Sequence, residues 1–170
     1  ESMGGLVLAL VLSVILVYMV MASQFESLLH PFTILLTIPL ALVGAVLLFF
    51  VTGTTINIMG VIGVIMLSGI AVNNSIILVD RINQIKGDYD RLTDAIVVAA
   101  SQRIRPILMT SLTTILSLLP MAITFGEGAS LRAPMAIAVI GGLVTSTFLS
   151  LVVIPCVYYL LEQMKRKVMG

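Results

Sequence analysis

Two adjacent amides stand in the middle of a long apolar segment. Asn73 and Asn74 lie within residues 27–79, which contain no Asp, Glu, Lys or Arg. Each amide has two N–H donors and a carbonyl acceptor that need partners. A polar group at membrane depth is costly and is therefore a functional candidate. The pair could belong to a transport pathway, or it could form an interhelical hydrogen-bond clamp worth about 1 kcal/mol per bond.

A polar stripe follows a basic residue further along the chain. Arg103, Thr110 and Ser117 recur at intervals of seven residues, which places them on one face of a helix. Thr113 and Thr114 flank the same stripe. A cation at the end of a hydroxyl-lined face could shape a water-filled path. Alternatively, these hydroxyls bond back to carbonyls of their own helix, as they often do in membrane helices.

Titratable groups are scarce where a proton carrier would need them. Neither residues 27–79 nor residues 106–126 contain a carboxylate, and Asp80 lies at the edge of the first segment. We expect His30 in a short loop outside the membrane. The chain by itself therefore lacks the titratable centre of a proton-driven pump, which would have to come from elsewhere.

The sequence also argues against an enzyme. It contains no glycine-rich phosphate loop, no metal-ligand spacing and no Ser/His/Asp grouping. The single cysteine, Cys156, excludes a disulfide framework and a multi-cysteine metal site. We predict neither enzymatic activity nor a bound cofactor or metal.

The composition predicts that membrane helices position these residues. Of the 170 residues, 59% are hydrophobic and 10% are charged, and the mean hydropathy is +1.19. A soluble domain has about 25% charged residues, so a soluble domain is excluded. A net charge of +1 offers no basic field for nucleic acid.

Four stretches of the chain contain no charged residue, and each is long enough for a spanning helix of about 20 residues. They are residues 2–25, 27–79, 106–126 and 133–161. The longest must hold two helices, divided by the polar, β-branched turn at residues 51–57. We therefore predict an all-α polytopic bundle, a single transmembrane domain over residues 1–170. Its five predicted spans are residues 4–23, 32–51, 58–80, 105–124 and 134–160.

The segment before the fourth span has its own helical pattern. Apolar residues recur on one face from Leu92 to Ala99, after Asp88 and Asp90. We predict a short amphipathic helix over residues 88–102 along the inner membrane surface. The simplest interpretation is a connector, and a regulatory or lipid-binding role is the less supported alternative.

The basic residues predict an orientation. Residues 81–105 and the tail after residue 161 hold eight of the nine basic residues, and five spans place both regions on one side. Arg132 alone is on the other side. Because basic residues favour the cytoplasm, we expect the N-terminus outside and the C-terminus inside.

Small residues predict how the helices pack. In lipid, helices associate through close contact of small side chains. Gly5, Ala9 and Ser13 form such a seam in the first span, which we expect to face the bundle. The last span has a longer seam at every fourth residue, made of Ala138, Gly142, Ser146 and Ser150.

Three segments in this order resemble the resistance-nodulation-division (RND) efflux transporters. GIAVNNSIILVD (residues 69–80), followed by RINQ, resembles the tenth membrane helix of that family. RIRPILMTS (residues 103–111) resembles the start of the eleventh, and residues 22–45 resemble the link between the eighth and ninth. The resemblance is greatest to the hydrophobe/amphiphile branch, which exports drugs.

The resemblance implies that the chain is the C-terminal membrane block, helices eight to twelve, of such a pump. The chain also begins at Glu1 rather than Met, as expected of a piece of a longer polypeptide. The absent N-terminal repeat would carry the paired aspartates of proton coupling, in its fourth helix. The implied pump is a homotrimer in the bacterial inner membrane, with a periplasmic adaptor and an outer-membrane channel as partners.

The resemblance also assigns proton-relay residues position by position. Arg103 and Thr110 match the arginine and threonine of the family's relay, and Asn74 matches a neighbouring asparagine. Asn73 stands where many members have a lysine that pairs with the aspartates. An amide can exchange only hydrogen bonds, so this chain departs from the charge-pair scheme.

The predicted function is thus a share of the proton pathway that drives export of drugs or other amphiphilic molecules. Two alternatives remain: a non-transporting structural module or orphan half, and a protein-export accessory of the SecD/SecF type.

Overall fold

The apolar stretches fold into long helices. The computed structural model describes residues 2–123 and 125–170, and within this part of the chain there is no strand. Five helical segments are long and apolar enough to cross a membrane. The predicted all-α class is confirmed, and the number of helical segments long and apolar enough to span agrees with the five predicted spans. The helices are α1 (Ser2–Phe25), α2 (Leu29–Leu35), α3 (Thr37–Thr52), α4 (Ile58–Ile85), α5 (Leu92–Ile123) and α6 (Ala129–Met169).

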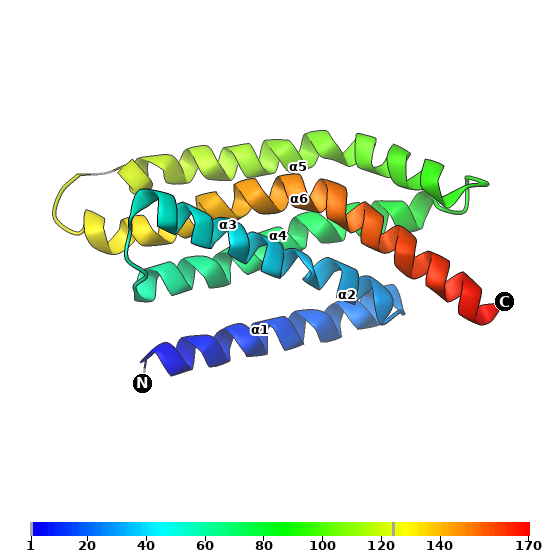
Figure 1. Ribbon diagram of the computed structural model, residues 1–170, viewed down its shortest axis with the longest axis horizontal. Helices are drawn as coiled ribbons and strands as arrows, with labels where there is room; N and C mark the ends of the chain where they lie inside the picture. The colour runs from blue at the N-terminus through cyan, green and yellow to red at the C-terminus, as the bar shows by residue number, and fades with distance from the viewer. Residues whose placement is uncertain (1, 124) are drawn as a thin grey trace.

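α6 is the central helix of the bundle. It packs on α2, α3, α4 and α5, whereas α1 lies at the edge and, among the described residues, packs on α2 and α4 (Figure 1). In the most apolar window of each helix, 56% of the residues are buried in α6 and 6% in α1. Successive spans run in opposite directions, so the α4–α5 connection and the end of α6 lie at one end of the bundle (Figure 1).

Close packing joins α3 to α6 through glycines. A Cβ atom on Gly141 would lie 2.6 Å from Leu48 Cβ and 2.7 Å from the carbonyl oxygen of Gly44. The two backbones therefore approach each other as closely as small residues allow. The predicted seam residues Ala138, Gly142, Ser146 and Ser150 are all buried in α6.

The seam predicted on α1 faces the bundle only at Ser13, which is half-buried and lines a cavity with Ile38 and Gly69. Gly5 and Ala9 are exposed, and a Cβ atom on Gly5 would meet nothing within 4 Å. Gly5 and Ala9 lie toward the start of α1, and among the described residues this helix packs lightly on the bundle, through α2 and α4.

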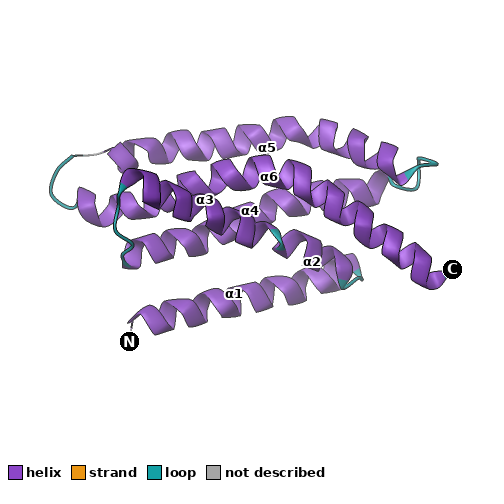
Figure 2. Ribbon diagram, in the orientation of Figure 1, coloured by secondary structure: helices purple, strands orange, loops and turns teal. Residues whose placement is uncertain are grey.

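The second predicted span is interrupted at Leu36, between α2 and α3 (Figure 2). Pro39 has no N–H to donate to the carbonyl four residues earlier, which weakens the helix at this point. Close to this point, the hydroxyl of Thr37 donates to the backbone carbonyl of Ile34, at 2.6 Å. The same Thr37 hydroxyl lies 2.6 Å from Ser75 Oγ, so the interruption is tied to α4.

The expectation that His30 lies in a loop is wrong. His30 is buried in the first turn of α2 and is followed by Pro31. A proline is tolerated there because the backbone N–H groups of the first turn have no carbonyl partner within the helix. Its ring stacks on Tyr158 of α6, with centroids 5.2 Å apart. The Tyr158 hydroxyl donates to Asn83 Oδ1 at 2.5 Å. These contacts join α2, α4 and α6 at one end of the bundle.

The separate amphipathic helix predicted over residues 88–102 is also wrong. Residues from Leu92 onward are helical but continue without a break into the fourth span, whose predicted last residue, Thr124, lies outside the described residues. The apolar face is covered by protein rather than by the membrane surface, since Ala95, Ile96 and Ala99 belong to a buried core that includes Ile82. Burial on α4 and α6 therefore extends α5 beyond the apolar stretch.

Candidate functional site

A chain of buried polar side chains joins three helices near Asn74. The amide Nδ2 of Asn74 donates to Ser111 Oγ at 3.4 Å. Ser111 Oγ lies 2.8 Å from Thr147 Oγ1, in a bond that either hydroxyl could donate. The three side chains come from α4, α5 and α6, and their residues are 5%, 3% and 3% exposed. We refer to them as the Asn74–Ser111–Thr147 chain.

This arrangement is the clamp that the sequence offered as one reading of Asn74. Buried polar groups are stable when each has a hydrogen-bond partner. Here each of the three side chains bonds to a side chain of a neighbouring helix. Ser111 and Thr147 were not predicted. Ser111 lies in the RIRPILMTS segment, directly after Thr110, and Thr147 directly follows a residue of the predicted α6 seam.

Asn73 lies outside this chain although it is adjacent to Asn74. Successive helix residues are about 100° apart around the axis, and this rotation turns Asn73 to an exposed face of α4. It forms no hydrogen bond within the described part of the molecule. The two amides therefore occupy different environments.

The hydroxyl stripe of α5 bonds back to its own helix. Thr110 Oγ1 donates to the carbonyl of Pro106 at 2.9 Å. Each of the other three hydroxyls also donates to a carbonyl three or four residues earlier; they belong to Thr113, Thr114 and Ser117. Of the two readings of the stripe, the structure shows the back-bonded one, and each hydroxyl oxygen keeps acceptor capacity.

Arg103 is the one residue of the described part with a buried side-chain nitrogen that lacks a partner. Its Nε atom is buried and makes no hydrogen bond among the described residues, although the residue as a whole is partly exposed. A buried N–H without an acceptor is unfavourable by about 1–3 kcal/mol. The guanidinium therefore has donor capacity to offer.

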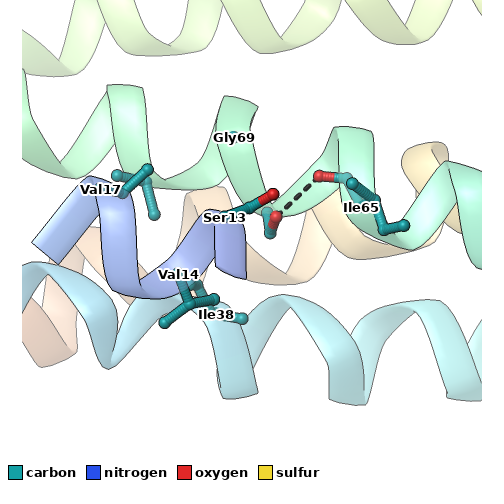
Figure 3. A pocket seen from close by; sticks show the side chains of 8 residues that line it. Ser13, Val14, Val17, Ile38, Ile65 and Gly69 are labelled. Carbon is teal, nitrogen blue, oxygen red and sulfur yellow. Dashed lines mark hydrogen bonds between the residues drawn. The ribbon is translucent and has the colours of Figure 1, made fainter. Parts of the chain in front are cut away.

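A separate cavity lies between α1, α3 and α4. It has a volume of about 180 Å³, and Ser13, Val17, Ile38 and Gly69 are among its lining residues (Figure 3). Its two hydroxyls bond to carbonyls of their own helices: Ser13 to Ala9 and Ser68 to Ile65, the latter bond being dashed in Figure 3. The cavity is thus apolar in character, and none of the predicted relay residues lines it.

Comparison with known proteins assigns the family. The model of the AcrB/AcrD/AcrF family matches residues 1–162. The chain belongs to this family of RND transporters. The match extends over all five spans, in agreement with the motif resemblance.

Relatives of this RND chain are much longer proteins. It is 37% identical over 171 residues to the swarming motility protein SwrC of Bacillus subtilis (strain 168). The aligned region is 100% of this chain and 16% of SwrC. One crystal form of a heavy metal efflux pump matches with a TM-score of 0.83 and 35% identity, over 92% of this chain and 16% of that one. A second crystal form matches with a TM-score of 0.73 and 37% identity, over 85% and 15%.

In this RND chain the four predicted relay residues fall into two groups. Asn74 is buried in a hydrogen-bonded chain that ends on α6. Asn73 and Thr110 are exposed, and Arg103 is partly exposed with an unpartnered buried N–H. Hence the structure brings Asn74 together with Ser111 and Thr147, and no hydrogen bond joins the other three to one another among the described residues.

Proposed function

We propose that this chain is the C-terminal membrane block, helices eight to twelve, of a proton-driven RND efflux transporter. The observation that carries the proposal is the family match over residues 1–162. The relatives are about six times as long as the chain, which spans 16% of SwrC. In the full protein, the block would work beside a first repeat that carries the paired aspartates.

The uncovered polar groups support a role beside that repeat. Asn73 and Thr110 are exposed, and Arg103 has a buried donor without an acceptor. A carboxylate from a neighbouring helix would supply the acceptor, in a charge-assisted hydrogen bond stronger than a neutral one. Protonation of that carboxylate would weaken the bond and allow the helices to shift.

Asn73 modifies this scheme. An amide presents both donors and an acceptor and has no charge to exchange. It can bond to a carboxylate in either protonation state. The relay proposed here therefore depends on Arg103 for its positive charge and on Asn73 for a hydrogen bond that switches direction.

The proposed substrates are drugs or other amphiphilic compounds, on the resemblance to the hydrophobe/amphiphile branch. A second candidate is a metal ion, because the two matched crystal structures are of a heavy metal efflux pump. Substrate choice is tested by comparing efflux of a cationic dye with resistance to copper, silver and zinc salts in the same cells.

The proposed setting is the bacterial inner membrane, with the α4–α5 connection and the end of α6 in the cytoplasm. Eight of nine basic residues lie in the segments 81–105 and 162–170, as the positive-inside rule requires. A homotrimer with a periplasmic adaptor and an outer-membrane channel is the proposed assembly.

The deciding experiment is dye efflux from cells that carry the full-length gene. Efflux is expected to stop when an uncoupler collapses the proton gradient and to resume when the gradient is restored. Gradient-independent efflux would contradict proton coupling. If the cells export neither dye nor metal ions but the protein still assembles, the structural-module alternative is supported, and a defect in protein secretion on deletion would support the SecD/SecF-type alternative.

A further inference from the structure

A cleft lies between the start of α5 and the end of α6, away from the relay residues. It has a volume of about 300 Å³. Its polar lining comes from two parts of the chain: Asp90, Arg91 and Thr93 beside the start of α5, and Tyr159, Gln163 and Arg166 on α6. The cleft is thus lined by two segments that are far apart in the sequence.

The charge of the cleft favours an anion. Its charged lining residues are two arginines, Arg91 and Arg166, and one acid, Asp90. Neither Arg91 nor Arg166 forms an ion pair within 4.0 Å in the described part of the chain, where the one such pair joins Lys86 to Glu162 at 3.9 Å. Both arginines therefore keep their donors available, and a guanidinium binds a phosphate through two parallel N–H bonds.

Neutral donors complete the lining. Gln163 Nε2 donates to the Tyr159 hydroxyl at 3.0 Å, which orients both side chains and leaves the Tyr159 proton free for another acceptor. The hydroxyl of Thr93 adds a further donor. Phosphate oxygens accept several hydrogen bonds at once, so this set of donors suits a phosphate better than a carboxylate.

The position of the cleft favours a lipid as the source of the phosphate. α6 has 41 residues and is therefore about 60 Å long, about twice the hydrocarbon thickness of about 30 Å. The charge-free stretch of this helix ends at Leu161, and Arg166 follows five residues later, about 7.5 Å along the axis. We therefore expect Arg166 at the level of the headgroups. In the orientation proposed above, on which this step rests, the cleft meets the cytoplasmic leaflet, where anionic lipids attract basic side chains.

We propose that this cleft binds the phosphate of an anionic phospholipid headgroup, with Arg91 and Arg166 as its two charged ligands. The bound phosphate would hold the start of α5 to the end of α6. Because α5 also carries Arg103 and Thr110, the lipid would restrain the helix that bears two of the proposed relay residues.

The test measures lipid binding to the purified full-length protein by native mass spectrometry. The probes are cardiolipin, phosphatidylethanolamine and inorganic phosphate. Cardiolipin is expected to stay bound and phosphatidylethanolamine to dissociate. Arg91→Gln and Arg166→Gln are each expected to weaken cardiolipin binding about tenfold, the loss of roughly one bidentate pair.

Controls separate this site from general attraction to basic surfaces. Arg132→Gln makes the same charge change at the opposite end of α6 and is expected to leave cardiolipin binding unchanged. An equal loss in that variant, or equal retention of both lipids, would overturn the proposal. Displacement of cardiolipin by millimolar phosphate would show a site for free phosphate and overturn the lipid assignment. Because the readout is binding, a failure here leaves the efflux proposal standing.

Discussion

The hydroxyl oxygens of Ser111 and Thr147 lie 2.8 Å apart in the buried interface between α5 and α6. Ser111 also accepts a hydrogen bond from Asn74, so the contact is the middle of a connection among three helices. All three residues are buried, and none can replace a lost partner with bulk water. The contact therefore contributes to the relative position of the helices that carry the proposed relay.

Thr147→Val is expected to destabilise the full-length protein by about 1–2 kcal/mol, because valine preserves the shape but leaves the Ser111 hydroxyl short of a partner. Thermal unfolding in detergent measures the change. Thr113→Val removes the same hydroxyl from an exposed position of α5, where among the described residues it bonds only to the carbonyl of Met109, and is expected to have little effect. Equal shifts in the two variants would show that the Asn74–Ser111–Thr147 chain does not stabilise the bundle.

The adjacent amides are expected to respond differently to the same substitution. Asn74→Leu should lower thermal stability, because it removes the donor to Ser111 and places a larger apolar group against buried hydroxyls. Asn73→Leu should lower stability less than Asn74→Leu does, since Asn73 is exposed and makes no hydrogen bond within the described part of the chain.

Measurements of dye efflux test the proposed transport role of Asn73 separately from the structural role of Asn74. Asn73→Leu is expected to reduce proton-driven efflux more than Asn73→Gln, because glutamine retains an amide that can bond to a carboxylate. Full activity in both variants would remove Asn73 from the mechanism. Parallel losses of stability in the leucine variants of both residues would contradict the separation of the two environments.

The sequence was sufficient for the spans but not for which polar side chains meet. Charge-free stretches predict spanning helices because lipid excludes charge, and each of the five predicted spans coincides with a helical segment long and apolar enough to span. Thr110 and Ser111 are chemically alike and adjacent, and the rotation of α5 alone decides that Ser111 faces α6 while Thr110 is exposed. That rotation depends on the packing of all the helices, which a local pattern does not contain.

Two other expectations were wrong for the same reason. His30 beside a proline suggests a loop, but stacking on Tyr158 favours a helical turn, and these residues are distant in the sequence. The apolar face that contains Ala95 and Ala99 fits a membrane surface as well as a protein core. Only the position of α4 and α6 shows that protein covers it.

The partly buried guanidinium leads to a prediction for α5. Arg103→Ala is expected to reduce proton-driven efflux about tenfold or more, because the proposed carboxylate partner loses its charged donor, a loss of about 1.4 kcal/mol for each factor of ten. Arg105→Ala is a matched control: it removes the same side chain two residues away, at an exposed position. Similar losses in both variants would indicate a general effect of positive charge rather than a relay residue.

Thr110→Ala tests the neighbouring hydroxyl in the same assay. We expect reduced efflux with unchanged stability, because the exposed hydroxyl bonds only to Pro106 within the described chain and is free to accept a further bond. Thr113→Ala removes an equivalent hydroxyl, also back-bonded and exposed, and should retain full efflux. Unchanged transport in both Arg103→Ala and Thr110→Ala would refute the relay assignment.

The close approach of α3 and α6 leads to a prediction about stability alone. Gly141→Ala places a methyl group 2.6 Å from Leu48 Cβ and 2.7 Å from the carbonyl oxygen of Gly44. Because backbone lies on one side of this contact, the helices must separate, at a cost of about 1–3 kcal/mol.

Thermal unfolding of the full-length protein in detergent measures this cost, with Gly69→Ala as the control. Gly69 also lies inside a helix, but a Cβ atom there would meet nothing within 4 Å. Its replacement is expected to be neutral or to stabilise α4 by up to about 1 kcal/mol, the difference in helix propensity between glycine and alanine. A Gly141→Ala protein as stable as the Gly69→Ala protein would mean that α3 and α6 do not pack through their glycines in the assembled membrane domain.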